Sequence, residues 1–284
     1  MSGNLGPLGD LGPDAVLRAL ATVREGIIVD LSVPLDPDLL PPVDPGSGEP
    51  LARRDLMTPE AFRDAAGSGA RGFHVDAFGG SIHQGTHIDG LAHLVEAGAI
   101  YGGRREADLR TDRGWIDGGV ETVPPIVTRG ILLDLAAEGP LPGSTVVTRD
   151  DIETALDRSP ASLEPGDAVL VRTGKIRELE TNRDRFLDRQ PGIDLDAAIL
   201  LAERGMSIYG SDTGGTEPQP VTDWERTVHA ELLVHRGIHL LEWLDLDRLA
   251  AELERRSRGA FLLVTLPLRI RGATGSWIRP IAIL

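Results

Sequence analysis

Short, continuous runs of apolar and β-branched residues recur along the chain and indicate buried strands. Runs of this kind, bounded by glycine and proline, are typical of strands that are covered on both faces. They predict strands over residues 27–33, 73–78, 130–135, 168–173 and 206–209. Segments with helical spacing lie between these runs, and such alternation favours a mixed or parallel sheet covered by helices. We therefore expect an α/β fold.

Residues that favour helix ends mark the boundaries of the predicted helices. Pro13 begins the first helix and Gly26 follows it. Thr58-Pro59-Glu60 combines an N-cap residue, a proline and a first-turn acid. Residues 1–12 are expected to attach loosely and residues 36–48 to form a loop, because both are rich in Gly and Pro. Helices are predicted over residues 13–24, 58–66, 148–159, 194–204 and 229–237.

The composition is that of an ordinary globular protein, with 41% hydrophobic and 26% charged residues. No linker or repeat divides the chain, which predicts a main domain over residues 26–284 after an N-terminal extension and helix over residues 1–25. The formal charge of −15 argues against nucleic acid or an anionic membrane as a partner. A secretory signal and an apolar stretch of membrane-spanning length are both missing, so we expect a cytoplasmic protein.

Three of the 7 histidines in the chain and one aspartate lie within eleven residues: His83, His87, Asp89 and His93. All four side chains can bind a metal ion. With no cysteine, any metal ligands must be imidazoles and carboxylates. On a strand the first two histidines would lie about 13 Å apart, at roughly 3.3 Å per residue. Because a metal needs its ligands at about 2.0–2.2 Å, the chain must bend between them, and Gly85 tolerates a bend there. If Asp89 begins a helix, His93 lies one turn further along the same face.

The motif His83-x-Gly85-Thr86-His87-x-Asp89-x-x-x-His93 resembles the signature of a metal-dependent cyclase/hydrolase family that includes bacterial kynurenine formamidase and isatin hydrolase. Leu91 replaces a proline that is common in the signature. The resemblance implies a single-domain, cyclase-like (swivelling β/β/α) fold with a mixed central sheet. It also implies that His83, His87 and Asp89 bind the metal, that His93 acts as acid/base, and that the chain forms a homodimer or higher homo-oligomer. Similar segments occur at residues 101–103, 129–134, 166–174, 210–213, 266–268, 275–276 and 280–282.

The segment from His229 to Glu242 resembles one that supplies a histidine and a glutamate to a second metal in kynurenine formamidases. There the glutamate follows the histidine by twelve positions, whereas Glu242 follows His229 by thirteen. Two alternatives therefore stand: the pair binds a second metal, or it serves the outer shell of a single ion or the substrate. His235 and His239, in the same segment, are interpreted as structural.

Other candidates have weaker patterns. Asp212 lies in a Gly-rich turn after a predicted strand, where it is a possible site residue or a turn former. Thr86 is expected to hydrogen-bond within the bend of the motif. Trp224 and Trp243 are candidates to line a pocket or to pack in the core, and the lone His74 is interpreted as structural.

The ligand set indicates the reaction class. A divalent ion held by two imidazoles and one carboxylate keeps a positive charge, which lowers the pKa of bound water from 15.7 to about 7. His93 would take the proton and return it to the leaving group. Zn²⁺ and Mn²⁺ both accept such ligands. These parts predict hydrolysis of a small amide, cyclic amide or lactone; the alternatives are a cyclase acting on a polyketide-type intermediate, and a non-catalytic binding protein with the same fold.

Overall fold

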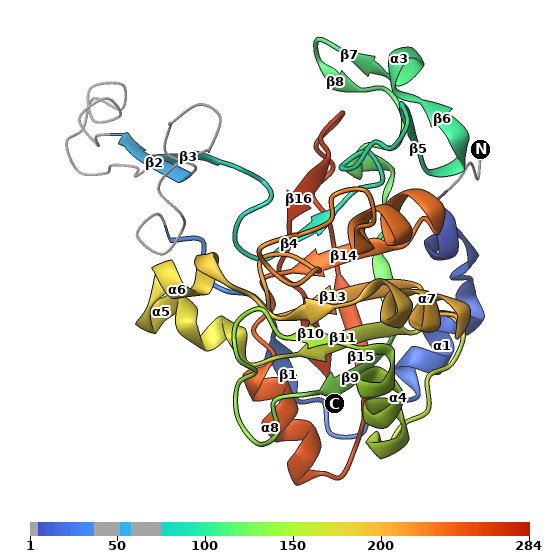
Figure 1. The fold of residues 1–284 in the computed structure, drawn as a ribbon, viewed down its shortest axis with the longest axis vertical. Coiled ribbons are helices and arrows are strands. Elements are labelled where there is room, and N and C mark those ends of the chain that lie inside the picture. Colours follow the sequence, from blue (N-terminus) through green and yellow to red (C-terminus); the bar gives the residue numbers. More distant parts are fainter. Residues whose placement is uncertain (1–4, 37–51, 58–74) are drawn as a thin grey trace, which may run out of the picture.

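A nine-stranded mixed sheet forms the centre of the computed structural model, which describes residues 5–36, 52–57 and 75–284 (Figure 1). Strands β9, β11, β13 and β14 are parallel to one another, and the strands on either side of them pair in antiparallel fashion. The predicted α/β fold with a mixed central sheet is confirmed. In spatial order the strands are β1 (Ile28–Asp30), β17 (Ile281–Ile283), β15 (Ala260–Thr265), β9 (Ile126–Asp134), β11 (Ala168–Arg172), β13 (Ile208–Ser211), β14 (His239–Glu242), β4 (His87–Asp89) and β16 (Gly275–Trp277).

Helices cover both faces of the parallel strands, which explains why the central positions of these strands are apolar. On one face, residues such as Val169 and Leu240 form a core with α4 (Arg149–Arg158) and α7 (Leu195–Glu203). On the opposite face, neighbouring positions of the same strands form a second core with α8 (Asp247–Arg255). The parallel centre is therefore buried on both sides, as the continuous apolar runs predicted.

Two predicted helix starts are present with the hydrogen bonds that favour them. Thr148 and Asp151 form a reciprocal capping box at the start of α4. The carboxylate of Asp194 accepts a hydrogen bond from the Ala197 N–H at 2.7 Å at the start of α7. Both side chains satisfy N–H groups that lack a partner in the first helical turn.

Two expectations about local structure are wrong, and a third is refined. The helix predicted over residues 229–237 is present, but Ala230–His235 have π-helical geometry and form η5. Asp89 does not begin a helix, because its backbone pairs with Gly275 at the end of strand β4. The N-terminal segment is not loosely attached, because Gly6–Asp10 form a 3₁₀-helix, η1, whose Leu8 is buried in the core.

The remaining elements are short. Helix α1 (Pro13–Leu20) is shorter than predicted and packs against β9 and β15. Strands β2 (Ala52–Met57) and β3 (Val75–Gly80) pair in antiparallel fashion, whereas the predicted helix over 58–66, most of the predicted loop and His74 lie outside the described residues. Among the described helices none is long and apolar enough to cross a membrane. The domain boundary near residue 25 stays a prediction. The other elements are β5 (Ala99–Ile100), η2 (Tyr101–Gly103), β6 (Arg104–Arg105), α3 (Glu106–Leu109), β7 (Arg110–Thr111), β8 (Gly114–Trp115), η3 (Val120–Thr122), β10 (Val146–Val147), η4 (Lys175–Arg177), α5 (Glu178–Thr181), α6 (Arg183–Asp188) and β12 (Gly192–Ile193).

Candidate metal centre

A bend before strand β4 brings the first three motif residues together. Gly85 has a φ of 65°, in the left-handed region that glycine adopts without strain. As a result, the His83 Nδ1 atom lies 2.8 Å and the His87 Nε2 atom 3.4 Å from the same oxygen, Oδ1 of Asp89. The bend that the ligand distances required is therefore present at the predicted residue.

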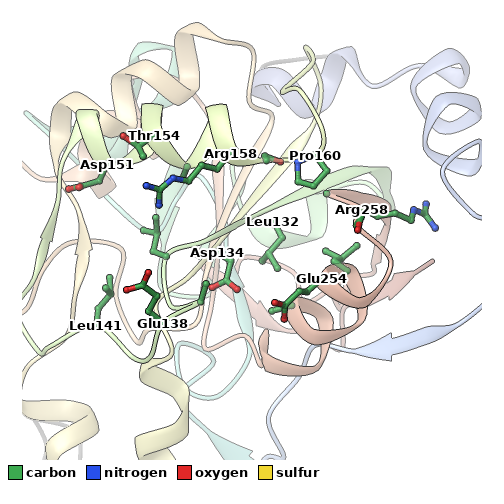
Figure 2. A pocket seen from close by; sticks show the side chains of 18 of the residues that line it. Leu132, Asp134, Glu138, Leu141, Asp151, Thr154, Arg158, Pro160, Glu254 and Arg258 are labelled. Carbon is green, nitrogen blue, oxygen red and sulfur yellow. The ribbon is translucent and has the colours of Figure 1, made fainter.

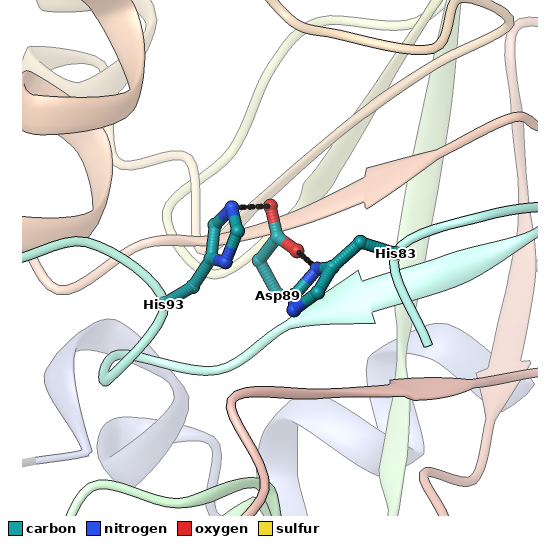
Figure 3. A group of neighbouring side chains, drawn as sticks. All are labelled: His83, Asp89 and His93. Atoms are coloured by element: carbon teal, nitrogen blue, oxygen red, sulfur yellow. Dashed lines mark hydrogen bonds and ion pairs between the residues drawn. The ribbon is translucent and has the colours of Figure 1, made fainter. Parts of the chain in front are cut away.

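His93 reaches the other carboxylate oxygen of Asp89 from the turn that follows β4. Its backbone N–H donates to the carbonyl of Gly90 at 2.9 Å, and its Nε2 atom lies 3.9 Å from Asp89 Oδ2 (Figure 3). The His93 and His83 rings are stacked with their centres 4.0 Å apart. Burial lowers the pKa of His93 to about 4, although the charge of Asp89 opposes this shift. A tight turn thus places His93 at the centre, where the sequence had suggested a helical turn.

His229 and Glu242 complete the group from the second half of the chain. Glu242 ends β14 and is paired in register with His87 on β4. The Glu242 Oε2 atom lies 3.6 Å from His87 Nε2, and its Oε1 atom lies 3.4 Å from His229 Nε2. His229 Nε2 also lies 3.7 Å from Asp89 Oδ2. Segments about 150 residues apart in sequence therefore meet around one carboxylate, that of Asp89.

The π-helix η5 lies within the thirteen-residue spacing between His229 and Glu242. A π turn closes a hydrogen bond across five residues, one more than an α turn. The Arg236 N–H donates to the Glu231 carbonyl in this way at 3.0 Å. With this turn between them, His229 and Glu242 both reach the centre.

The donor set fits a divalent cation. Asp89 is fully buried, and its Oδ2 atom accepts no hydrogen bond from the described residues. A buried carboxylate oxygen without a partner is costly, and a cation removes that cost. Burial raises the pKa of Asp89, but the surrounding imidazoles outweigh burial and hold that pKa well below its usual value. The carboxylate is therefore ionised and ready to bind a cation.

The spacing of the donor atoms supports the same conclusion. Two ligands on a tetrahedral ion at about 2.1 Å are roughly 3.4 Å apart. The 3.4 Å and 3.6 Å distances from His87 Nε2 to Asp89 and Glu242 match this separation. The His87 Nδ1–H donates to the Gly85 carbonyl at 2.9 Å, which leaves Nε2 as the free ligand atom. His83 differs, because its Nδ1 contacts Asp89 and its Nε2 contacts the Thr274 hydroxyl at 2.9 Å.

Two predicted candidates, Asp212 and Thr86, do not join this group. The Asp212 carboxylate accepts hydrogen bonds from the N–H and hydroxyl of Thr173 and from the Gly174 N–H, at 2.7–2.8 Å. Burial raises the pKa of Asp212 to about 6 despite these bonds. Thr86 does not bond within the bend: its hydroxyl donates to the Trp243 carbonyl at 2.7 Å and accepts from the Val33 N–H at 2.8 Å. Both side chains therefore join distant segments of the backbone.

His235, His239 and the two tryptophan candidates lie outside the group of donor atoms. His239 is buried and bonds through Nδ1 to the Asp89 carbonyl at 2.7 Å, so it supports the backbone of a candidate ligand. His235 is partly exposed on η5, between two glutamates. Trp243 is buried against Phe186, whereas Trp224 is 78% exposed and cannot be part of the core.

Two residues that the sequence did not single out contact the centre directly. The Thr216 hydroxyl donates to Glu242 Oε1 at 2.9 Å. The Glu217 carboxylate bonds to the Nδ1 atom of His229 at 2.5 Å and accepts from the His229 backbone N–H at 2.6 Å. Both directly follow the Gly-rich turn that contains Asp212, so a hydroxyl and an acid next to that turn were the available sequence signal.

A cavity of about 890 Å³ lies away from these residues, beside α4 and α8 (Figure 2). Its lining includes Leu132 on β9, Arg158 on α4 and Glu254 on α8, but none of the six clustered imidazole and carboxylate residues. The cavity is therefore separate from the candidate metal centre.

Comparisons with known proteins identify the family. A family described as "Putative cyclase" matches residues 29–218. Kynurenine formamidases of Bacillus cereus and Bacillus thuringiensis are each 34% identical over 204 residues, which is 71% of this chain and 76% of those proteins. Another Bacillus cereus kynurenine formamidase is 33% identical over 123 residues, and there the match spans about half the length of the relative, 51%.

Solved structures show the same fold. The crystal structure of a novel cyclase aligns with a TM-score of 0.87 and 27% identity, covering 100% of this chain and 97% of that chain. Isatin hydrolase A from Ralstonia solanacearum aligns with a TM-score of 0.66 and 24% identity, covering 95% of both chains, and supports the fold. The resemblance inferred from the motif is confirmed, and the chain belongs to this cyclase family.

Proposed function

We propose that the protein is a metal-dependent hydrolase that cleaves the C–N bond of a small amide or cyclic amide. The observation that carries the proposal is the convergence of four imidazoles on two carboxylates, Asp89 and Glu242, which are buried. The names of the relatives, kynurenine formamidase and isatin hydrolase, support hydrolysis of such bonds. A lactone is a further substrate class that the same groups would serve.

The residues around Asp89 would hold one or two divalent ions. His87, Asp89 and Glu242 form one possible ligand set, and His83 and His229 offer further nitrogen donors beside it. A bound Zn²⁺ or Mn²⁺ supplies Lewis acidity, which polarises a carbonyl and makes water more acidic. The sequence resemblance makes His83 a ligand. To bind the ion, His83 would give up either the contact of its Nδ1 atom with Asp89 or the contact of its Nε2 atom with Thr274.

The exposed side of the centre indicates where a substrate would enter. The side chains of His87, Asp89 and Glu242 are at most 5% exposed, whereas those of His83, His93 and His229 are 17–30% exposed. A substrate would approach from the histidine side. His93 is the most exposed of the three, and we assign it the transfer of a proton from water to the leaving nitrogen.

The cyclase alternative is favoured by the family description and by the solved cyclase structure. Ring closure of a polyketide-type intermediate needs the same Lewis acid and the same proton-transfer group. A homo-oligomer and a cytoplasmic location stay predictions; light scattering and cell fractionation test them.

A substrate panel separates the possibilities. N-formyl aryl amines, cyclic amides and lactones are incubated with the purified protein, and release of carboxylic acid is measured with and without chelator. We expect release that the chelator abolishes and that His93→Ala lowers by about 10²–10⁴-fold. His235→Ala, which removes an imidazole outside the centre, is the matched control. If no substrate in the panel releases carboxylic acid, the hydrolase proposal is overturned. If the protein turns over no substrate at all, by hydrolysis or by ring closure, a binding protein is favoured.

A further inference from the structure

The consecutive residues Thr216 and Glu217 lie in contact with two candidate ligands that are thirteen positions apart. Thr216 is fully buried and Glu217 is 7% exposed. Thr216 bonds to Glu242 and Glu217 bonds to His229. One short segment after β13 therefore holds both ligand candidates from the second half of the chain.

The bonds of Glu217 determine which nitrogen of His229 faces the centre. One oxygen of Glu217, Oε1, accepts a hydrogen bond from the His229 backbone N–H at 2.6 Å, and the other, Oε2, lies 2.5 Å from Nδ1 of the His229 ring. A carboxylate oxygen at this distance acts as the acceptor, so the Nδ1 atom of His229 carries the hydrogen. The other nitrogen, Nε2, then points toward Asp89 and Glu242. Because Glu217 also binds the backbone N–H of His229, it holds both the ring and the start of η5.

Thr216 orients Glu242 in a similar way. Its hydroxyl donates to Oε1 of Glu242 at 2.9 Å, and the second oxygen, Oε2, faces His87 at 3.6 Å. Rotation of the carboxylate would break the bond to Thr216. The hydroxyl thus favours the orientation in which Glu242 faces both His87 and His229.

Close packing against β12 makes this support rigid. The Ile193 N–H donates to the Thr216 carbonyl at 3.2 Å. A Cβ atom at Gly192 would lie 2.3 Å from the Glu217 carbonyl carbon, so the two backbones touch at a position where a side chain does not fit. The backbone of Thr216 and Glu217 is therefore packed directly against the backbone of β12, on which it is fixed by a hydrogen bond.

We propose that Thr216 and Glu217 are positioning residues that preorganise Glu242 and His229 for a divalent ion. The inference rests on the proposed function, since it takes the centre to be a metal site. Partners of this kind raise the basicity of a histidine ligand and fix its ring, and their loss lowers metal affinity by about 10–100-fold.

The test compares Zn²⁺ and Mn²⁺ affinity of the full chain, measured by competition with a fluorescent chelator. Glu217→Gln offers one acceptor oxygen for the two His229 donors, and we expect its affinity to fall by about 10–100-fold. Thr216→Val should lose affinity, whereas Thr216→Ser, which keeps the hydroxyl, should retain it. Glu225→Gln, in an exposed part of the same connecting segment, is the matched control and should bind as the wild type does.

A readout in metal-free protein separates positioning from a general loss of structure. In the wild type, nitrogen-labelled histidine should give a slowly exchanging Nδ1–H signal from His229, and Glu217→Gln should lose it. If Glu217→Gln does not fold, Glu217→Asp and the two Thr216 variants carry the test. A variant that melts at a lower temperature without metal but binds the ion as tightly as the wild type would overturn the inference, because its role would be structural alone.

The outcomes also separate this inference from the proposed function. If wild-type protein binds no divalent ion, both fall together. If the wild type binds the ion and Glu217→Gln and Thr216→Val bind it with equal affinity, the inference is overturned and the proposed function stands.

Discussion

Replacement of Thr86 by valine tests whether this hydroxyl holds the metal-binding bend in place. Thr86 is 2% exposed, and its hydroxyl links the motif to the Val33 N–H and the Trp243 carbonyl. Valine has nearly the same shape but no hydroxyl, so both backbone groups lose a partner in a region that water does not reach. Each buried polar group left without a partner costs about 1–3 kcal/mol. The free energy of unfolding should therefore fall by about 2–6 kcal/mol.

Urea unfolding of metal-free protein gives the measurement, because a bound ion would add its own stabilisation. We expect Thr86→Val to lower the midpoint while the dependence on urea concentration stays the same. Thr86→Ser is the control: it keeps the hydroxyl, loses one methyl group and should lose about 1 kcal/mol. A Thr86→Val protein whose free energy of unfolding lies within about 0.5 kcal/mol of the wild type would refute the reasoning.

Trp243 makes the same substitution informative about the metal centre. Its φ of 58° is in the left-handed region, which is strained for a tryptophan, and it directly follows Glu242. The bond from Thr86 to the Trp243 carbonyl is one of the contacts that hold this conformation. Loss of the bond should allow the backbone at residue 243 to relax and should weaken metal binding through Glu242.

Two further predictions concern stability. Asp151→Ala removes one half of the capping box of α4 and should cost about 1 kcal/mol in thermal unfolding at pH 7, whereas Asp150→Ala, its neighbour in the first turn, should cost less. Hydrogen bonds from Thr148 lower the pKa of Asp151. The stability that Asp151 contributes is therefore fully present above its unfolded-state pKa and is lost as pH falls through its folded-state pKa. Equal losses of stability in Asp151→Ala at pH 7 and at pH 2 would contradict this. Gly130→Ala places a Cβ 2.5 Å from the Phe261 ring and should destabilise the fold by about 1–3 kcal/mol in urea unfolding, and an unchanged midpoint would show that the ring can move aside.

The parallel centre and the bend were predictable because each follows from a local constraint. The apolar runs that became β9 and β11 are buried on both faces, and only buried strands keep such runs. The bend at Gly85 follows from the short distances that a metal requires of His83 and His87. In both cases the residues from which the prediction was made, the apolar runs and Gly85, are the same residues that form the buried strands and the bend.

Features that depend on distant segments were not predictable from one sequence. The partners of Thr86 are 53 and 157 positions away. Asp89 ends a strand because β4 pairs with β14 on one side and with β16 on the other, and pairing of this kind overrides a local preference for a helix. Likewise, nothing in the sequence distinguishes Glu217 from other acids near turns, and its contact with His229 is seen only in the folded protein.

Metal analysis of the purified, metal-replete protein and of Asp89→Asn tests the central claim most directly. Asparagine keeps the size of the side chain but removes its charge and one acceptor oxygen. Elemental analysis should find at least one Zn²⁺ or Mn²⁺ per wild-type chain and a large loss of that ion in Asp89→Asn. A wild-type protein that holds no divalent ion, or a variant that holds as much as the wild type, would contradict the account.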